Sequence, residues 1–398
     1  MNAPSGRILT RISDAELERR WRLVRSAMRE RRMDALVMQA TNDWLGGYVK
    51  WFTDLPANNG YPRSIVFHID DAMTIVEMGP TGATRALSGD ALYRGAGEAK
   101  LTPSFLSIDY THAYDAELVV ADLKPRSYRT IGLVGKGALP HAFVTHIEGA
   151  IGAVEFLDAT PMVDRIKAVK SAEEIDLIRA TAKMQDRVFA AVLEHVRPGM
   201  RDVDVTAFAQ LQGQLMGSEQ GIFLGGSSPM GTRSPFVPRY MQGRTLQRGD
   251  HLSLLIENNG PGGFYTEIAR TIVLGKASNE LKDGFESVRE AQTHTLSLIE
   301  PGVSCRDIHS AHNAYMEKRR LPPELRLYAH GQGYDMVERP LIRSDETMMI
   351  EAGMNLAVHP GYETDSIFAV ICDNYLVETT GVSDCLHATE KRLFELSV

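Results

Sequence analysis

Two glutamates around one predicted turn are the residues whose types and spacing first suggest chemistry. Glu257 and Glu267 are separated by a segment that contains Asn258-Asn-Gly-Pro-Gly-Gly263, a run typical of a tight connection between antiparallel strands. If the strands pair symmetrically about Gly262, the two glutamates face each other across the ladder. Facing carboxylates destabilise a fold unless a metal ion, a basic group or a shared proton compensates, so the pair indicates an active site. A shifted register or a solvated strand would instead separate the charges.

A second symmetric pair lies further along the chain. His359 and Cys372 are equally distant from the point between Asp365 and Ser366, so they too could be neighbours across a strand pair. His330 stands in Ala329-His-Gly-Gln-Gly333, whose two glycines allow a ligand to approach the backbone closely. A single histidine of this kind is more often structural, and a cysteine is more often a small core residue. Together with the glutamates, however, these side chains form a set in which every member can bind a metal or move a proton.

The elements that position these residues fall into two groups, the first of which is an amino-terminal α/β domain. From Ser13, apolar residues recur at helical spacing, as in Leu17, Val24 and Met28. Short β-branched strands are predicted at residues 34–38, 63–69, 73–78, 130–134 and 154–157. We therefore predict a small α/β domain over residues 1–165.

The second group begins at Ser171-Ala-Glu-Glu174, a capping box that starts a helix ended by Pro198-Gly199. Further helices are predicted at residues 203–216, 281–299 and 305–318, with a hairpin over 251–274 and strands at 354–359 and 367–377. Helices interleaved with antiparallel hairpins predict an α+β domain over residues 166–398.

Composition excludes several classes of function. The 398 residues include 43 basic and 51 acidic side chains, a net charge of −8, so a nucleic-acid partner is not expected. No stretch of about 18 apolar residues predicts a membrane span or an export signal. The three cysteines lack CxxC spacing, which argues against a disulfide framework or a zinc ribbon. The expected compartment is the cytoplasm.

Several motifs, in chain order, resemble those of the creatinase/prolidase (M24, pita-bread) family. The motifs are Gly249-Asp250, Phe264-Tyr-Thr-Glu-Ile-Ala-Arg-Thr271, Ala329-His-Gly-Gln-Gly333, His359-Pro360 and Cys372-Asp-Asn-Tyr-Leu-Val377. The resemblance covers nearly the whole chain. It implies a pita-bread catalytic domain over residues 166–398, preceded by a smaller creatinase-type α/β domain over residues 1–165.

The resemblance also shows where this chain departs from the family's peptidases, which carry two metals on two aspartates, a histidine and two glutamates. The matching positions here are Glu257, Glu267, His330, His359 and Cys372. Only the first histidine is the family's residue. Val337 stands where the proline-specific peptidases have a catalytic histidine, and Arg233 replaces a second one. Because valine cannot shuttle a proton, we predict that the chain is not a typical Xaa-Pro peptidase.

Creatinase, a metal-free member of the family that this chain resembles, hydrolyses a C–N bond of a small substrate. Arg63 matches in spacing the creatinase arginine that reaches into a neighbouring subunit's site and holds a substrate carboxylate, which implies a homodimer. The alternative is a surface arginine that opens a strand. Trp44 and Trp51 could roof the same pocket or pack at the domain edge.

The preferred hypothesis is a hydrolase without a cofactor that cuts a non-peptide C–N bond, such as that of an amide, an amidine or a small ring, in a small carboxylate-bearing metabolite. One glutamate would act as the general base and His330 or His359 as the acid, while Arg63 and Arg233 orient the anionic end. Alternatively, Cys372 could attack the substrate as a thiolate.

Two other hypotheses use the same fold. In the first, the five matching residues hold one divalent ion (zinc, iron or nickel) in a hydrolase or lyase. A site made of aspartates and glutamates suits manganese, whereas histidine and cysteine are softer ligands that suit these three metals. In the second, the pocket has lost activity and serves as a binding module. The polar residues of the pocket argue against the second, because a site without function would tend to become apolar.

Overall fold

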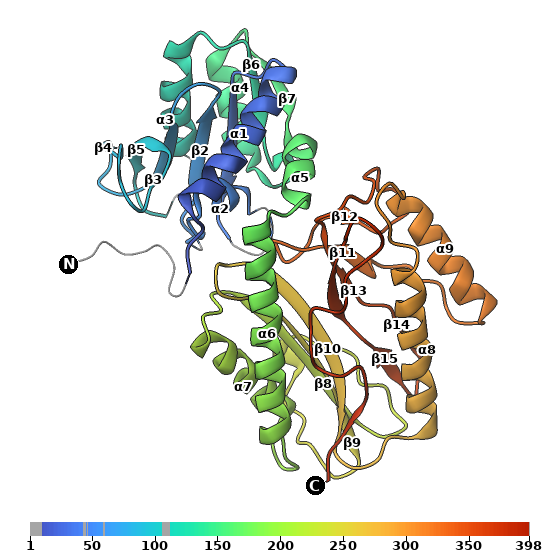
Figure 1. Ribbon diagram of the computed structural model, residues 1–398. Helices are drawn as coiled ribbons and strands as arrows, with labels where there is room; N and C mark the ends of the chain where they lie inside the picture. Colours follow the sequence, from blue (N-terminus) through green and yellow to red (C-terminus); the bar gives the residue numbers. More distant parts are fainter. Residues whose placement is uncertain (1–9, 43–44, 46, 59, 106–111, 398) are drawn as a thin grey trace. The chain divides into compact units, whose positions relative to one another are not determined.

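The computed structural model describes residues 10–42, 45, 47–58, 60–105 and 112–397. The chain divides into two compact units, Met1–Lys167 and Ala168–Val398, which are treated separately below (Figure 1). Over the described ranges, none of the helices has the length and apolar character that crossing a membrane requires.

The amino-terminal unit is built on a mixed seven-stranded sheet. Its strand order is β4-β5-β3-β2-β1-β6-β7. The strands are β1 (Ala35–Ala40), β2 (Arg63–His68), β3 (Met73–Met78), β4 (Thr84–Ala86), β5 (Ala96–Thr102), β6 (Thr130–Leu133) and β7 (Glu155–Asp158). The helices are α1 (Asp14–Glu30), α2 (Tyr48–Thr53), α3 (Tyr114–Leu123), α4 (His141–Ile151) and α5 (Thr160–Ala168).

A local side-chain cap explains where the first helix of this unit begins. The Ser13 hydroxyl accepts a hydrogen bond from the Glu16 N–H at 3.1 Å and so caps α1, whose Leu17, Val24 and Met28 are buried. Trp51 is also buried and meets Phe52 edge to face, with ring centroids 5.2 Å apart. It therefore packs in the core of this unit, whereas Trp44 lies outside the described residues.

The carboxy-terminal unit contains two four-stranded sheets, ordered β17-β10-β9-β8 and β12-β11-β13-β16. The first half comprises α6 (Ala172–His195), α7 (Asp202–Leu215), β8 (Gly221–Pro229), β9 (Asp250–Asn259) and β10 (Tyr265–Val273). The second comprises α8 (Asn279–Leu296), α9 (Cys305–Lys318), β11 (Ala329–Gly331), β12 (Glu338–Leu341), β13 (Asn355–Val358), β14 (Gly361–Glu363), β15 (Phe368–Val370), β16 (Asp373–Leu376) and β17 (Phe394–Glu395).

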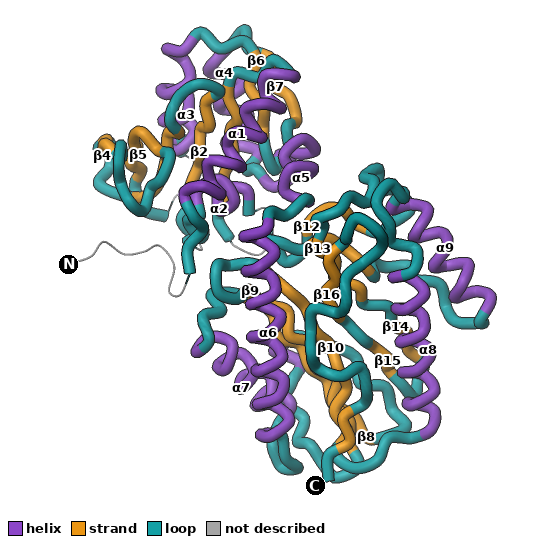
Figure 2. The backbone as a smooth tube through the Cα atoms, viewed as in Figure 1, coloured by secondary structure: helices purple, strands orange, loops and turns teal. Residues whose placement is uncertain are grey.

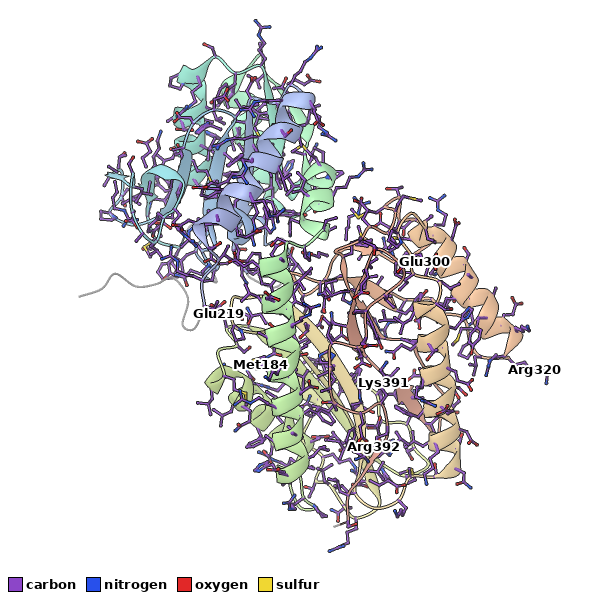
Figure 3. The ribbon with its side chains drawn as sticks, in the orientation of Figure 1. Met184, Glu219, Glu300, Arg320, Lys391 and Arg392 are labelled. Carbon is purple, nitrogen blue, oxygen red and sulfur yellow. The ribbon has the colours of Figure 1, made fainter. Side chains whose placement is uncertain are left out.

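Each sheet of this unit has its own pair of helices. Figure 2 shows α6 and α7 flanking the first sheet, with α8 and α9 beside the second. A β-bridge between Ala269 and Cys372 joins the sheets. After β16 the chain runs back past Lys391 and Arg392, labelled in Figure 3, to β17, which pairs in parallel with β10. Two sheets with two helix pairs are the two-halved arrangement that the predicted pita-bread domain requires.

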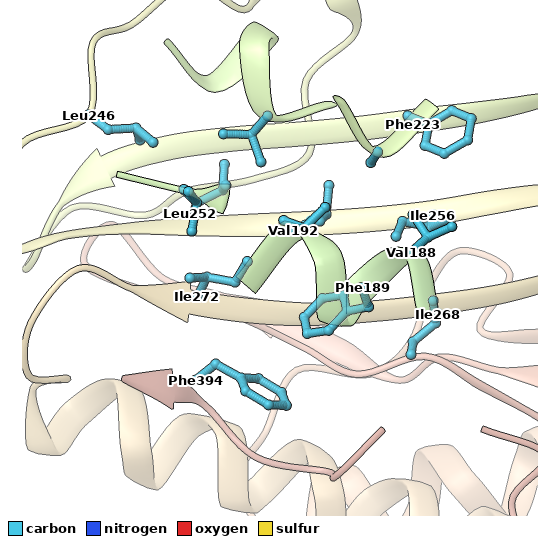
Figure 4. Packing of buried hydrophobic residues seen from close by; sticks show 14 of the residues in the cluster. Val188, Phe189, Val192, Phe223, Leu246, Leu252, Ile256, Ile268, Ile272 and Phe394 are labelled. Carbon is cyan, nitrogen blue, oxygen red and sulfur yellow. The ribbon is translucent and has the colours of Figure 1, made fainter. Parts of the chain in front are cut away.

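The first sheet carries the main core of this unit. Val188 and Val192 of α6 pack with Leu252, Ile256 and Ile268 of the central strands (Figure 4). All residues of β9 and β10 are buried, because α6 covers one face of this hairpin and the second half of the unit lies against it. Any charged residue in these strands is consequently removed from bulk water.

Candidate active site in the carboxy-terminal unit

The glutamate pair forms as predicted. Strands β9 and β10 pair in the register that sets Glu257 opposite Glu267, and positive φ values of 85° and 82° at Gly262 and Gly263 let the chain reverse between them. Both glutamates are buried, with 5% and 6% of their surfaces exposed. Directly opposed residues share one face of the sheet, so two carboxylates meet within the protein.

Two histidines lie beside Glu267. His330 Nε2 is 3.6 Å from Glu267 Oε2, and the His330 and His359 ring centroids are 5.1 Å apart. His330 Nδ1 lies 3.0 Å from the Gly331 carbonyl oxygen, which can only accept, so Nδ1 carries a proton and Nε2 faces the carboxylate. A ring oriented in this way can serve as a base or as a ligand.

Cys372 is close to the same carboxylate but is held as a thiol. The ladders on either side, Val358↔Asp373 and Gly361↔Val370, have the register predicted for His359 and Cys372. The thiol donates to the Glu267 carbonyl at 3.5 Å, and burial together with the charge of Glu267 raises its pKa well above the ordinary value. A buried thiol of this kind is a core residue rather than an activated nucleophile.

The surroundings of the two carboxyl groups give them different pKa values. Burial, followed by the negative charge of Glu267, raises the pKa of Glu257 well above its ordinary value. The pKa of Glu267 falls to about 2, because charge interaction with His359 and hydrogen bonding and charge at His330 outweigh burial. Burial lowers the pKa of His359 to about 4. The surroundings therefore favour the proton on Glu257 and the negative charge on Glu267.

Three buried amides complete the site and were not predicted. Gln332 donates from Nε2 to Glu257 Oε1 at 2.9 Å, and its Oε1 accepts from Asn374 Nδ2 at 2.8 Å. Asn374 also contacts Asn355. In the sequence, Gln332 and Asn374 were marked only by their places in the motifs that contain His330 and Cys372.

The two arginines expected to bind substrate have partners of their own. Arg63 pairs with Glu77 at 2.8 Å and donates to the Pro56 carbonyl at 2.9 Å, inside the amino-terminal unit. Arg233 pairs with Glu363 at 3.2 Å, and both side chains are 46% exposed. Each would have to exchange this partner to bind a substrate carboxylate, so their predicted roles stay predictions.

The donor set fits one metal ion better than two. The ligand atoms of Glu267, His330 and His359, here called the two-histidine group, lie within 4.8 Å of one another. Two imidazoles and one carboxylate are a ligand set that zinc or iron accepts. On the other side of the site, Glu257 Oε1 faces an amide donor and the Cys372 thiol is engaged as a donor. These contacts therefore do not accommodate the two metal ions that peptidases of the resembled family carry.

Another group of potential ligands lies at Asp373, Cys385 and His387. There Arg270 Nη2 is 2.6 Å from Asp373 Oδ1, and both side chains are fully buried. Because the guanidinium already neutralises this carboxylate, we assign the group a structural role.

Comparison with known proteins shows which family the chain resembles. The sequence model of metallopeptidase family M24 matches residues 176–379 of this chain. The Xaa-Pro dipeptidase of Pyrococcus horikoshii is 24% identical over 263 residues, which are 65% of this chain and 73% of that protein. A probable dipeptidase PepE of Mycobacterium tuberculosis is 24% identical over 257 residues, covering 63% and 67%. These names give no support to the prediction that the chain differs from the Xaa-Pro peptidases.

Solved structures establish the fold. The X-Pro aminopeptidase of Thermotoga maritima superposes with a TM-score of 0.77 at 15% identity, covering 94% of this chain and 99% of that one. Dipeptidase PepE of Mycobacterium ulcerans gives 0.75 at 20% identity, covering 98% and 100%. The predicted pita-bread fold is confirmed, and the chain belongs to metallopeptidase family M24.

Proposed function

We propose that this protein hydrolyses a C–N bond in a small, carboxylate-bearing, non-peptide molecule, and that Glu257 moves the proton. The observation that carries the proposal is the buried Glu257–Glu267 pair, whose surroundings raise the pKa of Glu257 and lower the pKa of Glu267. Two titratable groups whose environments separate their pKa values are the arrangement that acid–base catalysis uses.

The proton transfer follows from this inequality. Glu257, whose raised pKa favours its protonated form, gives its proton to the substrate nitrogen as the C–N bond breaks. It regains a proton from the water whose oxygen bonds to the substrate carbon, so no net proton is gained or lost. Glu267 keeps its negative charge and orients His330, while Gln332 holds one oxygen of Glu257 in place.

The choice of a non-peptide substrate depends on the residues that this chain lacks. Val337 stands at the position of the histidine that the resembling peptidases use, and Cys372 is a buried thiol. The relatives' names point instead to Xaa-Pro dipeptides. A direct comparison of substrates separates the two.

The test is an amine-release assay on purified protein with two panels, one of small amides, amidines and lactams that bear a carboxylate, the other of Xaa-Pro dipeptides. We expect turnover in the first panel, abolished in Glu257→Gln. Preferential hydrolysis of the dipeptides would contradict the non-peptide proposal and identify a peptidase.

A second candidate is the same hydrolysis, or a lyase reaction, with one divalent ion, favoured by the two-histidine group. Such an ion would supply Lewis-acid chemistry, by lowering the pKa of water or polarising a carbonyl group. Metal content by plasma mass spectrometry, before and after chelation, separates the candidates. One ion per chain that is lost in His359→Ala supports this candidate, while no ion in active protein supports the first.

We further propose a cytoplasmic homodimer. Cys305, Cys372 and Cys385 are free thiols, as is usual in a reducing compartment. In a dimer, Arg63 would leave Glu77 to hold a substrate carboxylate of the neighbouring subunit. Mixing inactive Arg63→Ala with inactive Glu257→Gln subunits tests this, because only a shared site recovers activity.

A further inference from the structure

Hydrogen bonds to main-chain groups determine which end of each side-chain amide near Glu257 is the oxygen and which is the nitrogen. The Glu267 N–H can only donate, and Asn374 Oδ1 accepts from it at 2.7 Å. Asn374 therefore presents its Nδ2 to Gln332 Oε1, at 2.8 Å, and to Asn355 Oδ1, at 3.2 Å. Asn355 is oriented independently, because its Nδ2 donates to the Gln332 carbonyl at 3.1 Å.

The orientation of Gln332 follows from these contacts. Since its Oε1 faces the Asn374 donor, its Nε2 must point the other way, toward Glu257 Oε1 and the Met336 carbonyl, both at 2.9 Å. These two acceptors use both hydrogens of the amide. Gln332 and Asn374 are fully buried and Asn355 is 1% exposed, so water does not offer alternative partners.

The lone pair of an amide nitrogen is delocalised into the carbonyl group, so Gln332 Nε2 offers no ligand to a cation. It also directs its positive end at Glu257 Oε1, one of the two oxygens with which this carboxylate could bind a metal ion. We infer that Gln332 is a positioning residue that closes the Glu257 side of the site to metal ions. The site then takes at most one ion, at the two-histidine group, and Glu257 remains available for proton transfer.

This inference deepens the proposed function, because it depends on the Glu257–Glu267 pair being the reactive site. It is tested by counting ions without substrate, so its failure is distinguishable from a failure of the proposed activity. The probe is Mn²⁺ alone, added to chelator-treated full-length protein and measured by equilibrium dialysis with plasma mass spectrometry.

The decisive variant is Gln332→Glu, which keeps the size of the side chain and replaces the donor with a carboxylate oxygen. We expect it to bind about one Mn²⁺ per chain more than the wild type, which binds one at most. Two ions in the wild type, or equal counts in wild type and folded variant, would overturn the inference.

A matched control is Gln292→Glu, the same substitution at a glutamine that is 1% exposed in the same unit. Gln292 Oε1 accepts from Lys391 Nζ at 3.0 Å, and its Nε2 donates to the Val358 carbonyl at 2.9 Å and to Asp373 Oδ2 at 3.3 Å. A glutamate there therefore lies beside a buried carboxylate, as in Gln332→Glu, but that carboxylate is Asp373 and not Glu257. We expect no additional Mn²⁺. A gain in this control equal to that of Gln332→Glu would overturn the inference, because any buried carboxylate would then recruit an ion.

Asn374→Asp keeps the test decisive if Gln332→Glu does not fold, as judged by circular dichroism and melting temperature. The aspartate still accepts from the Glu267 N–H but cannot donate to Gln332, which is then free to turn its oxygen toward Glu257. We expect about one additional Mn²⁺ per chain here as well. An unchanged number of bound Mn²⁺ ions in folded Asn374→Asp would refute the inference that Asn374 orients Gln332.

Discussion

At the scale of single residues, burial decides what each titratable group can do. Glu257 and Glu267 have the same chemistry and face one another, yet only one of them has histidines at its side. Burial and then the charge of Glu267 raise the pKa of Glu257, whereas the histidines lower the pKa of Glu267. Neighbours rather than residue type thus assign the two roles.

The first prediction concerns Glu257→Gln. An amide cannot exchange a proton with water or with a leaving nitrogen, so we expect kcat to fall by roughly 10²- to 10⁴-fold. The melting temperature should be unchanged or higher, because the substitution removes the possibility of like charges in the pair. Steady-state kinetics and thermal unfolding measure both effects.

Glu351→Gln, at an exposed position of the same unit, is the control and should retain wild-type kinetics. A Glu257→Gln protein with undiminished kcat on the natural reaction would remove Glu257 from the catalytic role.

The second prediction concerns Cys372→Ala. If the buried thiol is a core residue, the variant keeps kcat within a few-fold of wild type and loses roughly 1 kcal/mol of unfolding free energy. Cys305→Ala, at a buried cysteine in another core cluster, should lose a similar amount. Loss of all activity in a folded Cys372→Ala, with Cys305→Ala active, would instead identify Cys372 as the nucleophile or as an essential ligand.

At the scale of elements, one buried arginine ties the two sheets of the carboxy-terminal unit together. Arg270 of β10 pairs with Asp373 of β16 at 2.6 Å and donates to the Cys372 carbonyl at 3.0 Å. Further bonds reach the Thr389 and Glu390 carbonyls in the segment that leads to β17. Five donors in a rigid fork suit a junction at which several carbonyl groups converge.

The third prediction follows from this junction. Arg270→Met removes one partner of a fully buried ion pair and leaves Asp373 without its guanidinium partner, so we expect a loss of about 3–5 kcal/mol of unfolding free energy in urea denaturation. The double variant Arg270→Met/Asp373→Asn should be more stable than Arg270→Met alone. Equal stability of the single and double variants would show that the pair is not coupled.

At the scale of the whole molecule, the carboxy-terminal unit contains the Glu257–Glu267 pair and, apart from it, a buried histidine whose pKa is lowered. His312 of α9 is fully buried, and its Nδ1 is 2.7 Å from the Thr295 hydroxyl oxygen. Over the described residues its Nε2 has no hydrogen-bond partner. Burial, followed by the charges of His294 and His309, lowers the pKa of His312 to about 4.

The fourth prediction is a loss of stability on acidification. Between the ordinary histidine pKa of 6.5 and the folded value of about 4, the unfolded chain binds a proton that the folded chain does not. The contribution of His312 to stability is therefore complete above pH 6.5 and declines as the pH falls toward 4, by at most about 3 kcal/mol. Urea denaturation of wild type and His312→Gln measures it.

We expect His312→Gln, which retains a bond to Thr295, to show a shallower decline over this range. His141→Gln, at an exposed histidine of the amino-terminal unit, should have the slope of the wild type. Parallel curves for wild type and His312→Gln would assign the acid sensitivity to other groups.

The sequence by itself determined the features that depend on local pattern. The glycine-containing turn predicted the register of Glu257 and Glu267, and the Ser171 capping box, confirmed in the structure, predicted the start of α6. Such features could be predicted because a turn or a cap is decided by residues within about ten positions of one another. Strand β8 was missed, since Gly221–Pro229 lacks alternation and is a strand only through its pairing with β9.

Only the tertiary structure decided which of the candidate residues act together. It brought Gln332 to Glu257 and Asn374 to Gln332, contacts that span 75 and 42 positions of the chain. It also gave Arg233 an acidic partner 130 positions away. The physical reason is that burial and hydrogen-bond partners depend on packing between distant strands, so residue type alone fixed neither the raised pKa of Glu257 nor the orientation of the amides around it.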